Sequence, residues 1–122
     1  MTDKSYELCG VPILECEAEG PKVRTGADAT DLISAAWERK VELVALPLAR
    51  LDDGFLTLST RIAGEIIQKF VTYGQRLAIV GDIGEATAQS AALRDFVYES
   101  NRGRHVWFVA ELDELREMLA RG

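Results

Sequence analysis

The stretch that decides the fold is residues 59–82, STRIAGEIIQKFVTYGQRLAIVGD. Its first part, residues 60–73, repeats apolar residues at intervals of three and four, which predicts an amphipathic helix. A short turn at 74–75 follows, and residues 76–80 form an almost wholly apolar run that ends at a Gly-Asp pair. Such a run is typical of a strand that is covered on both faces. The stretch therefore predicts a long helix that leads into a central strand.

The remaining chain predicts further strands and helices around this pair. Two short apolar segments at 6–9 and 11–17 indicate an opening hairpin, in which Pro12 belongs at an edge or a turn. Strands that alternate with helices imply crossover connections and a largely parallel sheet. The order β-β-α-β-α-β-α-β-α predicts one α/β domain over residues 1–122, with a mixed sheet of about five strands and helices packed on it. The other predicted elements are a helix at 31–40, a strand at 41–46, a helix from 87 or 88 to 100, a strand at 105–110 and a helix at 112–120.

Several single residues in these elements have a predicted role. Asp28 or Thr30 should cap the first helix, because both are good N-cap residues. Trp37 lies on the apolar face of that helix, so we expect it in the core. Gly64 lies within the long helix, where it would permit close backbone packing. Asn101 or Gly103 would end the third helix in a left-handed conformation.

Composition and charge exclude several classes of protein. The 122 residues are 48% hydrophobic and 28% charged, an ordinary balance for a folded domain, and the net charge of -6 disfavours a free-standing nucleic-acid binder. No apolar run is long enough to span a bilayer, and no secretory leader is recognisable. Cys9 and Cys16, the only cysteines, are expected as two buried thiols. These features predict a cytoplasmic protein without a metal, a cofactor, a membrane anchor or a nucleic-acid partner.

The two edges of the predicted sheet differ in charge. The edge at the carboxyl ends of the strands is acidic and includes Asp82, but it lacks the glycine spacing of a phosphate-binding loop. These carboxylates would either form a site or cap helices and face water. The opposite edge is basic and would either face water or bind an acidic partner or a phosphate. Its basic residues are Lys40, Arg76, Arg102, Arg104 and His105.

Candidate catalytic groups are few. His105 is the single histidine, no serine or cysteine lies in a nucleophile-elbow pattern, and a structural role for His105 is favoured. Asp82 with Glu65 or Glu85 would be a carboxylate pair for acid–base chemistry, although the spacing does not require one. We therefore assign no catalytic residue, and the sequence favours a protein that is not an enzyme.

Three motifs resemble a known family. They are AGEIIQKF at 63–70, LAIVGD at 77–82 and ESNRGRHVWFV at 99–109. Together they resemble a family of short bacterial proteins that is known only as a domain of unknown function. The resemblance supports the α/β fold and implies no activity.

A second, more distant resemblance is to the sulfate-transporter and anti-sigma-factor-antagonist (STAS) domain. In that family a segment Asp-Ser-Ser-Gly follows a strand, and a serine at the helix start is phosphorylated to switch partner binding. The matching place here is residues 58–61, where Ser59 or Thr60 would take the role of the serine. The aspartate and the glycine of the pattern are missing, and Arg61 replaces a small residue.

These observations lead to one main hypothesis and two alternatives. The main hypothesis is a small regulatory or protein-interaction module of STAS-like type, which binds a protein partner through the helix at 60–73 and the loop before it. The first alternative is a small-ligand-binding protein or minor enzyme with a pocket near Asp82. The second is a homodimer that uses exposed apolar residues such as Leu56 or Tyr98. The candidate binding residues are Ser59, Thr60, Glu65, Lys69, Asp82, Arg102 and Arg104.

Overall fold

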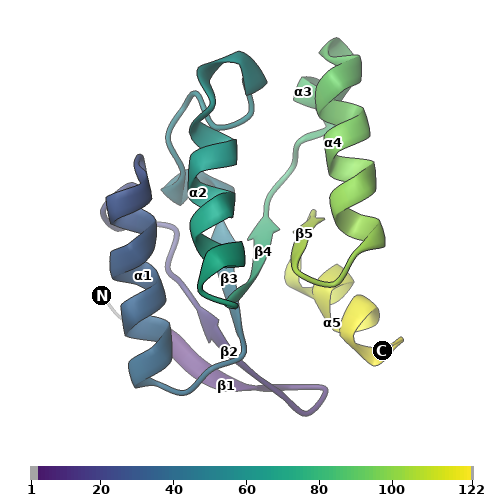
Figure 1. Cartoon of the computed structure of the whole chain (residues 1–122). Helices are drawn as coiled ribbons and strands as arrows, with labels where there is room; N and C mark the ends of the chain where they lie inside the picture. The colour runs from purple at the N-terminus through teal and green to yellow at the C-terminus, as the bar shows by residue number, and fades with distance from the viewer. Residues whose placement is uncertain (1–2, 122) are drawn as a thin grey trace.

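The protein is built on one five-stranded sheet whose strands lie in chain order (Figure 1). The structure, a computed structural model, describes residues 3–121. β1 and β2 form an antiparallel hairpin, whereas the pairs β2–β3, β3–β4 and β4–β5 are parallel. The predicted mixed α/β sheet is thus confirmed. The strands are β1 (Lys4–Leu8), β2 (Val11–Glu15), β3 (Leu43–Pro47), β4 (Arg76–Val80) and β5 (Val106–Val109).

Helices cover both faces of the sheet, but unequally. In Figure 1, α1, α2 and α4 stand in front of the sheet and α5 lies behind it. The helices are α1 (Gly26–Glu38), α2 (Ile62–Thr72), α3 (Gly84–Gln89), α4 (Ala91–Arg102) and α5 (Leu112–Ala120), with short 3-10 turns at Leu48–Arg50 and Leu58–Thr60. None of the helices in the described part of the chain is long and apolar enough to span a bilayer.

Alternation along the strands divides the core into two layers. Val44 and Leu46 of β3 face α1 and α2, where Phe70 of α2 is fully buried. Leu43 and Ala45 of the same strand face the other way, in the layer that includes Leu115 of α5. Because a strand turns successive side chains to opposite faces, a continuous apolar run fills both layers at once.

The N-terminus of α1 differs from the prediction. The helix begins at Gly26, and Thr25 is its N-cap, with the side-chain oxygen accepting a hydrogen bond from the Asp28 N–H at 3.2 Å. The Asp28 carboxylate in turn accepts one from the Arg24 N–H at 2.9 Å. The prediction that Asp28 or Thr30 caps the helix was therefore wrong. Gly26 and Ala29, which are buried, add one more turn to the helix before the apolar residues that were recognised.

The predicted third helix is two helices. Ser90 interrupts it with an extended backbone (φ -140°, ψ 110°), and its hydroxyl caps α4 by accepting a hydrogen bond from the Leu93 N–H at 3.1 Å. The end of α4 also differs from the prediction, because Gly103 has φ -86° and Asn101 is still helical. Neither residue is left-handed. Asn101 instead binds β5: its Oδ1 accepts from the Phe108 N–H at 2.7 Å and its Nδ2 donates to the Phe108 carbonyl at 3.1 Å.

Two further expectations about burial were wrong. A Cβ added to Gly64 would meet open space, so this glycine does not serve close packing. Cys9 is exposed at the tip of the β1–β2 hairpin, where its thiol lies 3.6 Å from the Arg116 carbonyl, and only Cys16 is buried. Sequence pattern alone does not reveal how far a hairpin tip extends beyond the core.

Candidate functional site

The predicted site residues lie at two opposite edges of the sheet. The helix α2 starts beyond the carboxyl end of β3 and ends before the amino end of β4, so Ser59 and Thr60 lie at the same edge as Asp82 (Figure 1). Arg102 and Arg104 come before the amino end of β5, at the other edge. The structure therefore does not bring the predicted residues into one site. We call these the carboxyl edge and the amino edge.

At the carboxyl edge, Ser59 and Thr60 have different surroundings. The Thr60 hydroxyl lies 2.8 Å from the Thr57 carbonyl and 2.9 Å from the Gly54 carbonyl, and it accepts a hydrogen bond from the Ile62 N–H at 3.3 Å. It therefore holds the loop before α2 together. Ser59 is exposed, and α2 begins three residues after it.

Glu65 and Lys69 support the packing of α1 on α2. The Glu65 carboxylate accepts a hydrogen bond from the Gly26 N–H at the start of α1, at 2.9 Å. The side chains of Glu65 and Lys69 both lie within 3.1 Å of the place that a Cβ on Gly26 would occupy. The carboxylate thus satisfies one of the unpaired N–H groups at a helix start, which is a structural role.

Asp82 is exposed and takes part in a turn. Its Oδ1 accepts a hydrogen bond from the Gly84 N–H at 2.9 Å, which sets the entry to α3.

A hollow of about 450 Å³ at the same edge is lined by Glu15, Cys16 and other residues. Burial raises the pKa of the Cys16 thiol to about 12. No group of three or more metal-ligating side chains occurs among residues 3–121.

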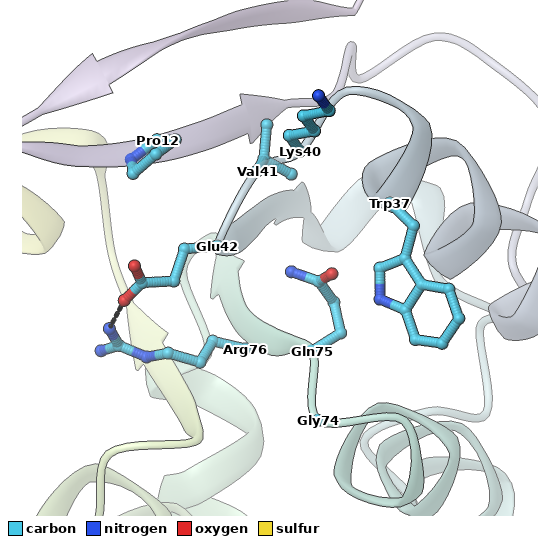
Figure 2. Close-up of a pocket in the computed structure, with 8 residues that line it drawn as sticks. All are labelled: Pro12, Trp37, Lys40, Val41, Glu42, Gly74, Gln75 and Arg76. Atoms are coloured by element: carbon cyan, nitrogen blue, oxygen red, sulfur yellow. Dashed lines mark hydrogen bonds and ion pairs between the residues drawn. The ribbon is translucent and has the colours of Figure 1, made fainter.

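The amino edge contains the arrangement that sequence reasoning missed. A hollow of about 450 Å³ lies between the end of α1 and the beginnings of β3 and β4 (Figure 2). Lys40, which follows α1 with a left-handed backbone (φ 58°), lines it together with the residue before β4, Gln75. The complete lining is Pro12, Trp37, Lys40, Val41, Glu42, Gly74, Gln75 and Arg76.

Gln75 is the unusual residue of this hollow. Only 2% of it is exposed, and its Nε2 has no hydrogen-bond partner in the described part of the chain. An unsatisfied buried polar group costs about 1–3 kcal/mol of stability, so most buried polar groups in proteins have a hydrogen-bond partner. In Figure 2 the amide stands between the Trp37 indole on one side and Val41 and Glu42 on the other. Its oxygen is turned toward Trp37 and its nitrogen away from Trp37, so the unpartnered Nε2 is buried beneath the lining of the hollow.

Trp37 is 52% exposed, so the prediction that it belongs to the core was wrong. It lies in the last turn of α1, next to the point where the chain enters β3, and it packs edge-on against Tyr73 with ring centroids 5.6 Å apart. Tyr73 is itself 41% exposed. The helical period assigns Trp37 to the apolar face, but it does not reveal that this face extends past the sheet. Two aromatic rings in mutual contact are thus presented to solvent, and one of them, Trp37, lines the hollow.

The opposite wall of the hollow is held by Arg76. Its guanidinium forms an ion pair with Glu42 at 3.3 Å, donates to the Arg104 carbonyl at 2.8 Å and lies 4.8 Å from the ring centroid of Trp107. Lys40 has no ion-pair partner within residues 3–121. Arg76 is therefore fixed and locally neutralised, whereas Lys40 gives the hollow a positive charge.

The remaining basic residues of the amino edge lie beside this hollow. Arg102 and Arg104 line a second, smaller one of about 260 Å³. Arg102 also forms an exposed ion pair with Glu99 at 3.6 Å and lies over the ring of Tyr98. His105 is bonded through Nε2 to the Phe70 carbonyl at 3.0 Å, so it ties the end of α2 to β5.

A comparison with known families places this chain. The model of a domain of unknown function, DUF4180, matches residues 9–119. The chain belongs to the DUF4180 family. No curated protein and no solved structure matches it. The DUF4180 match begins at the tip of the β1–β2 hairpin and extends into α5, so it includes every residue that lines the amino-edge hollow.

Proposed function

We propose that the protein is a small regulatory module that binds an acidic protein partner at the amino edge. The observation that carries the proposal is the pair of exposed aromatic side chains, Trp37 and Tyr73, in contact at the ends of α1 and α2. Tryptophan and tyrosine are enriched among the residues that dominate binding energy at protein interfaces. The proposal keeps α2 as the binding helix and moves the interface from its beginning to its end.

The charge of this edge supports an acidic partner. The chain as a whole has a net charge of -6, but Lys40, Arg76, Arg102 and Arg104 gather at the amino edge, where Glu42 pairs with Arg76 and Glu99 pairs with Arg102. A local positive surface accelerates the encounter with a negative one and selects against partners of the same sign. Aromatic side chains then supply the apolar contact that holds the complex.

A pull-down from the native lysate with quantitative mass spectrometry tests this function. We expect that Trp37→Ser and Tyr73→Ser each lose a partner that the wild-type protein captures, and that the partner has a net negative charge. Tyr6→Ser is the matched control, because Tyr6 is an exposed tyrosine of β1. Identical captured proteins for all four samples would contradict the proposal.

A regulatory role at Ser59 is a second proposal, which the exposure of this residue supports. A phosphate there would add about -1.5 to -2 charges close to the start of α2. Ser59→Asp should keep the fold and change which partner is captured, whereas Thr60→Asp should lower the melting temperature because the Thr60 hydroxyl holds the loop. If Ser59→Asp captures the same proteins as the wild type, Ser59 does not act as a switch.

The element order, with a hairpin followed by alternating helices and parallel strands, supports a STAS-like relationship.

A further inference from the structure

We propose that the outer edge of β1 binds β1 of a second copy of this chain, as an antiparallel strand pair that joins the two sheets. This surface is different from the pair of aromatic side chains at the ends of α1 and α2, and the proposal does not depend on the partner proposed there. Its starting point is a difference between the two edge strands of the sheet, β1 and β5.

Side chains of the same chain cover the edge at β5. The Asn101 side chain bonds both backbone groups of Phe108, at 2.7 and 3.1 Å. One residue beyond the strand, the Ala110 N–H donates to the Glu114 carboxylate at 2.7 Å. All residues of β5 are also buried. The backbone groups of Phe108 and the Ala110 N–H are therefore not available to another strand.

The edge at β1 has unpaired backbone groups. The Pro12 carbonyl of β2 accepts a hydrogen bond from the Glu42 N–H at 2.8 Å, so Pro12 turns toward β3 and not toward its partner in β1, Glu7. Opposed residues of an antiparallel pair alternate between bonded and non-bonded pairs, so Glu7 and Ser5 turn their N–H and C=O groups outward. Within residues 3–121 no other group is bonded to these outward groups. They are a template for a further strand.

The faces of β1 are uncovered as well. Its first four residues are exposed and only Leu8 is partly buried. Figure 1 shows the β1–β2 hairpin at the lower margin of the molecule, with its tip below the helices. Before the strand, the Asp3 carbonyl accepts a hydrogen bond from the Arg39 guanidinium at 3.3 Å, so the open edge begins with β1 itself. A second strand can thus approach β1 along its whole length.

The charges of β1 exclude two of the three registers that pair its middle with a second copy. In a symmetric antiparallel pair one residue lies opposite itself, and the residues on either side of it lie opposite each other. A pair centred on Glu7 places two carboxylates face to face. A pair centred on Ser5 places Asp3 opposite Glu7 of the second copy, which again opposes two negative charges. Like charges directly opposite each other destabilise a strand pair.

The register centred on Tyr6 has no such conflict. Glu7 lies opposite Ser5 of the second copy, and these residues exchange the hydrogen bonds that each lacks within its own chain. Lys4 lies opposite Leu8 of the second copy, so no like charges meet. The two Tyr6 residues form the central pair, which is non-hydrogen-bonded and so brings its side chains closest together. Tyr6 is 38% exposed, and the second copy covers it. The edge is therefore complementary to itself.

Proline substitution tests the backbone pairing. One short strand pair is a small interface, so we expect a reversible dimer, which sedimentation equilibrium over a dilution series up to about 1 mM detects. Glu7→Pro removes an outward N–H, so it should abolish the dimer and leave the melting temperature of the dilute protein unchanged. Glu7→Ala keeps this N–H and is the matched control, which should dimerise like the wild type. Ser5→Pro is the second variant and should act as Glu7→Pro does. A wild type that is monomeric throughout, or a dimer that survives in both proline variants, overturns the proposal.

Disulfide trapping tests the register. Opposed residues of a non-hydrogen-bonded pair have Cα atoms about 4.5 Å apart, which a disulfide can bridge. In a Cys9→Ser background, where Cys16 is buried, we expect Tyr6→Cys to form a covalent dimer under mild oxidation. Ser5→Cys should not, because its counterpart in the second copy lies two residues further along the pair. Tyr98→Cys is the control for chance collision, since Tyr98 is exposed on α4. Equal trapping of all three variants, or trapping of Ser5→Cys alone, overturns the proposal.

The dimer and the partner at the amino edge fail separately. Glu7→Pro leaves α1 and α2 unchanged, so it should still capture the Trp37-dependent partner from the lysate. The lysate control, Tyr6→Ser, keeps every backbone group of the β1 edge. A dimer without a Trp37-dependent partner supports this proposal alone. A wild type that is monomeric in isolation, with a lysate partner that Glu7→Pro loses and Glu7→Ala keeps, assigns the edge to another protein and overturns the pairing of two copies.

Discussion

At the scale of single residues, the surroundings of Cys16 and Tyr6 raise the pKa values of both side chains. The buried thiol of Cys16 has its pKa raised to about 12 by desolvation, so it is an inert thiol at neutral pH. The Tyr6 hydroxyl of β1 donates a hydrogen bond to the Glu15 carboxylate at 2.8 Å. Desolvation, followed by the hydrogen bond and the charge of Glu15, raises the pKa of Tyr6 to about 12. Both effects favour the protonated form in the folded state.

The raised pKa of Tyr6 predicts a loss of stability at high pH. In the unfolded chain the phenol has a pKa of 10.0, so between pH 10 and 12 the folded state binds more protons than the unfolded one. The contribution of Tyr6 is therefore complete below pH 10 and is lost as the pH rises to 12. Urea unfolding over this range should show a steeper fall in the free energy of unfolding for the wild type than for Tyr6→Phe. Parallel curves for wild type and Tyr6→Phe would contradict this assignment.

Gln75 and Trp37 show what a sequence leaves undetermined at this scale. An amide before an apolar strand is compatible with a solvated turn, and only the packing of three segments around Gln75 leaves it buried and unpartnered. The helical period places Trp37 on the correct side of α1 without indicating where the sheet beneath it ends. Both residues of the candidate site depend on where elements end, and element ends are what periodicity predicts least well.

At the scale of elements, periodicity predicted most of the fold. β4 at Arg76–Val80 and α5 at Leu112–Ala120 lie where the sequence pattern put them, because a continuous apolar run and a clear amphipathic repeat are strong signals. Where local capping competes with the repeat, the prediction failed. The hydroxyl of Ser90 ends one helix and starts another within a segment whose apolar spacing is compatible with a single helix.

Gly64 and Gly81 have opposite surroundings, and alanine substitutions should reveal the difference. Gly64 is exposed in the first turn of α2 with open space around it, so Gly64→Ala should raise the free energy of unfolding by about 0.5–1 kcal/mol. At Gly81, just after β4, an added Cβ would lie 2.6 Å from the Leu48 Cβ, and Gly81→Ala should cost about 1–3 kcal/mol. Chemical denaturation of both variants checks the pair. A lower free energy of unfolding for Gly64→Ala would contradict the prediction that the space around Gly64 is open.

At the scale of the whole molecule, the sheet has two edge strands, β1 and β5. An open edge presents unpaired N–H and C=O groups to other chains. On β5 the Asn101 side chain occupies both backbone groups of Phe108, as a neighbouring strand would. Asn101, which the sequence analysis predicted to end a helix, therefore caps the open edge of the sheet at β5.

Removing this closure should open the edge. Asn101→Ala deletes two hydrogen bonds to Phe108, which should cost about 1–3 kcal/mol because buried backbone groups lose their partners. The variant should also associate at high concentration, which light scattering detects. Asn101→Asp keeps the acceptor for the Phe108 N–H and should be intermediate in both measurements. If Asn101→Ala associates no further than the wild type and unfolds with the same free energy as the wild type, Asn101 does not protect the β5 edge.

The strand order has a consequence for the synthesis of the chain. Each strand pairs with the strand before it in the chain. The segment that has left the ribosome can therefore already form a sheet, whose open edge is the most recently synthesised strand. β5 needs a different partner for its outer side, since no further strand follows it in the sheet that residues 3–121 form. Asn101 emerges five residues ahead of β5, within α4. The side chain that closes the final edge is thus synthesised before the strand that requires it.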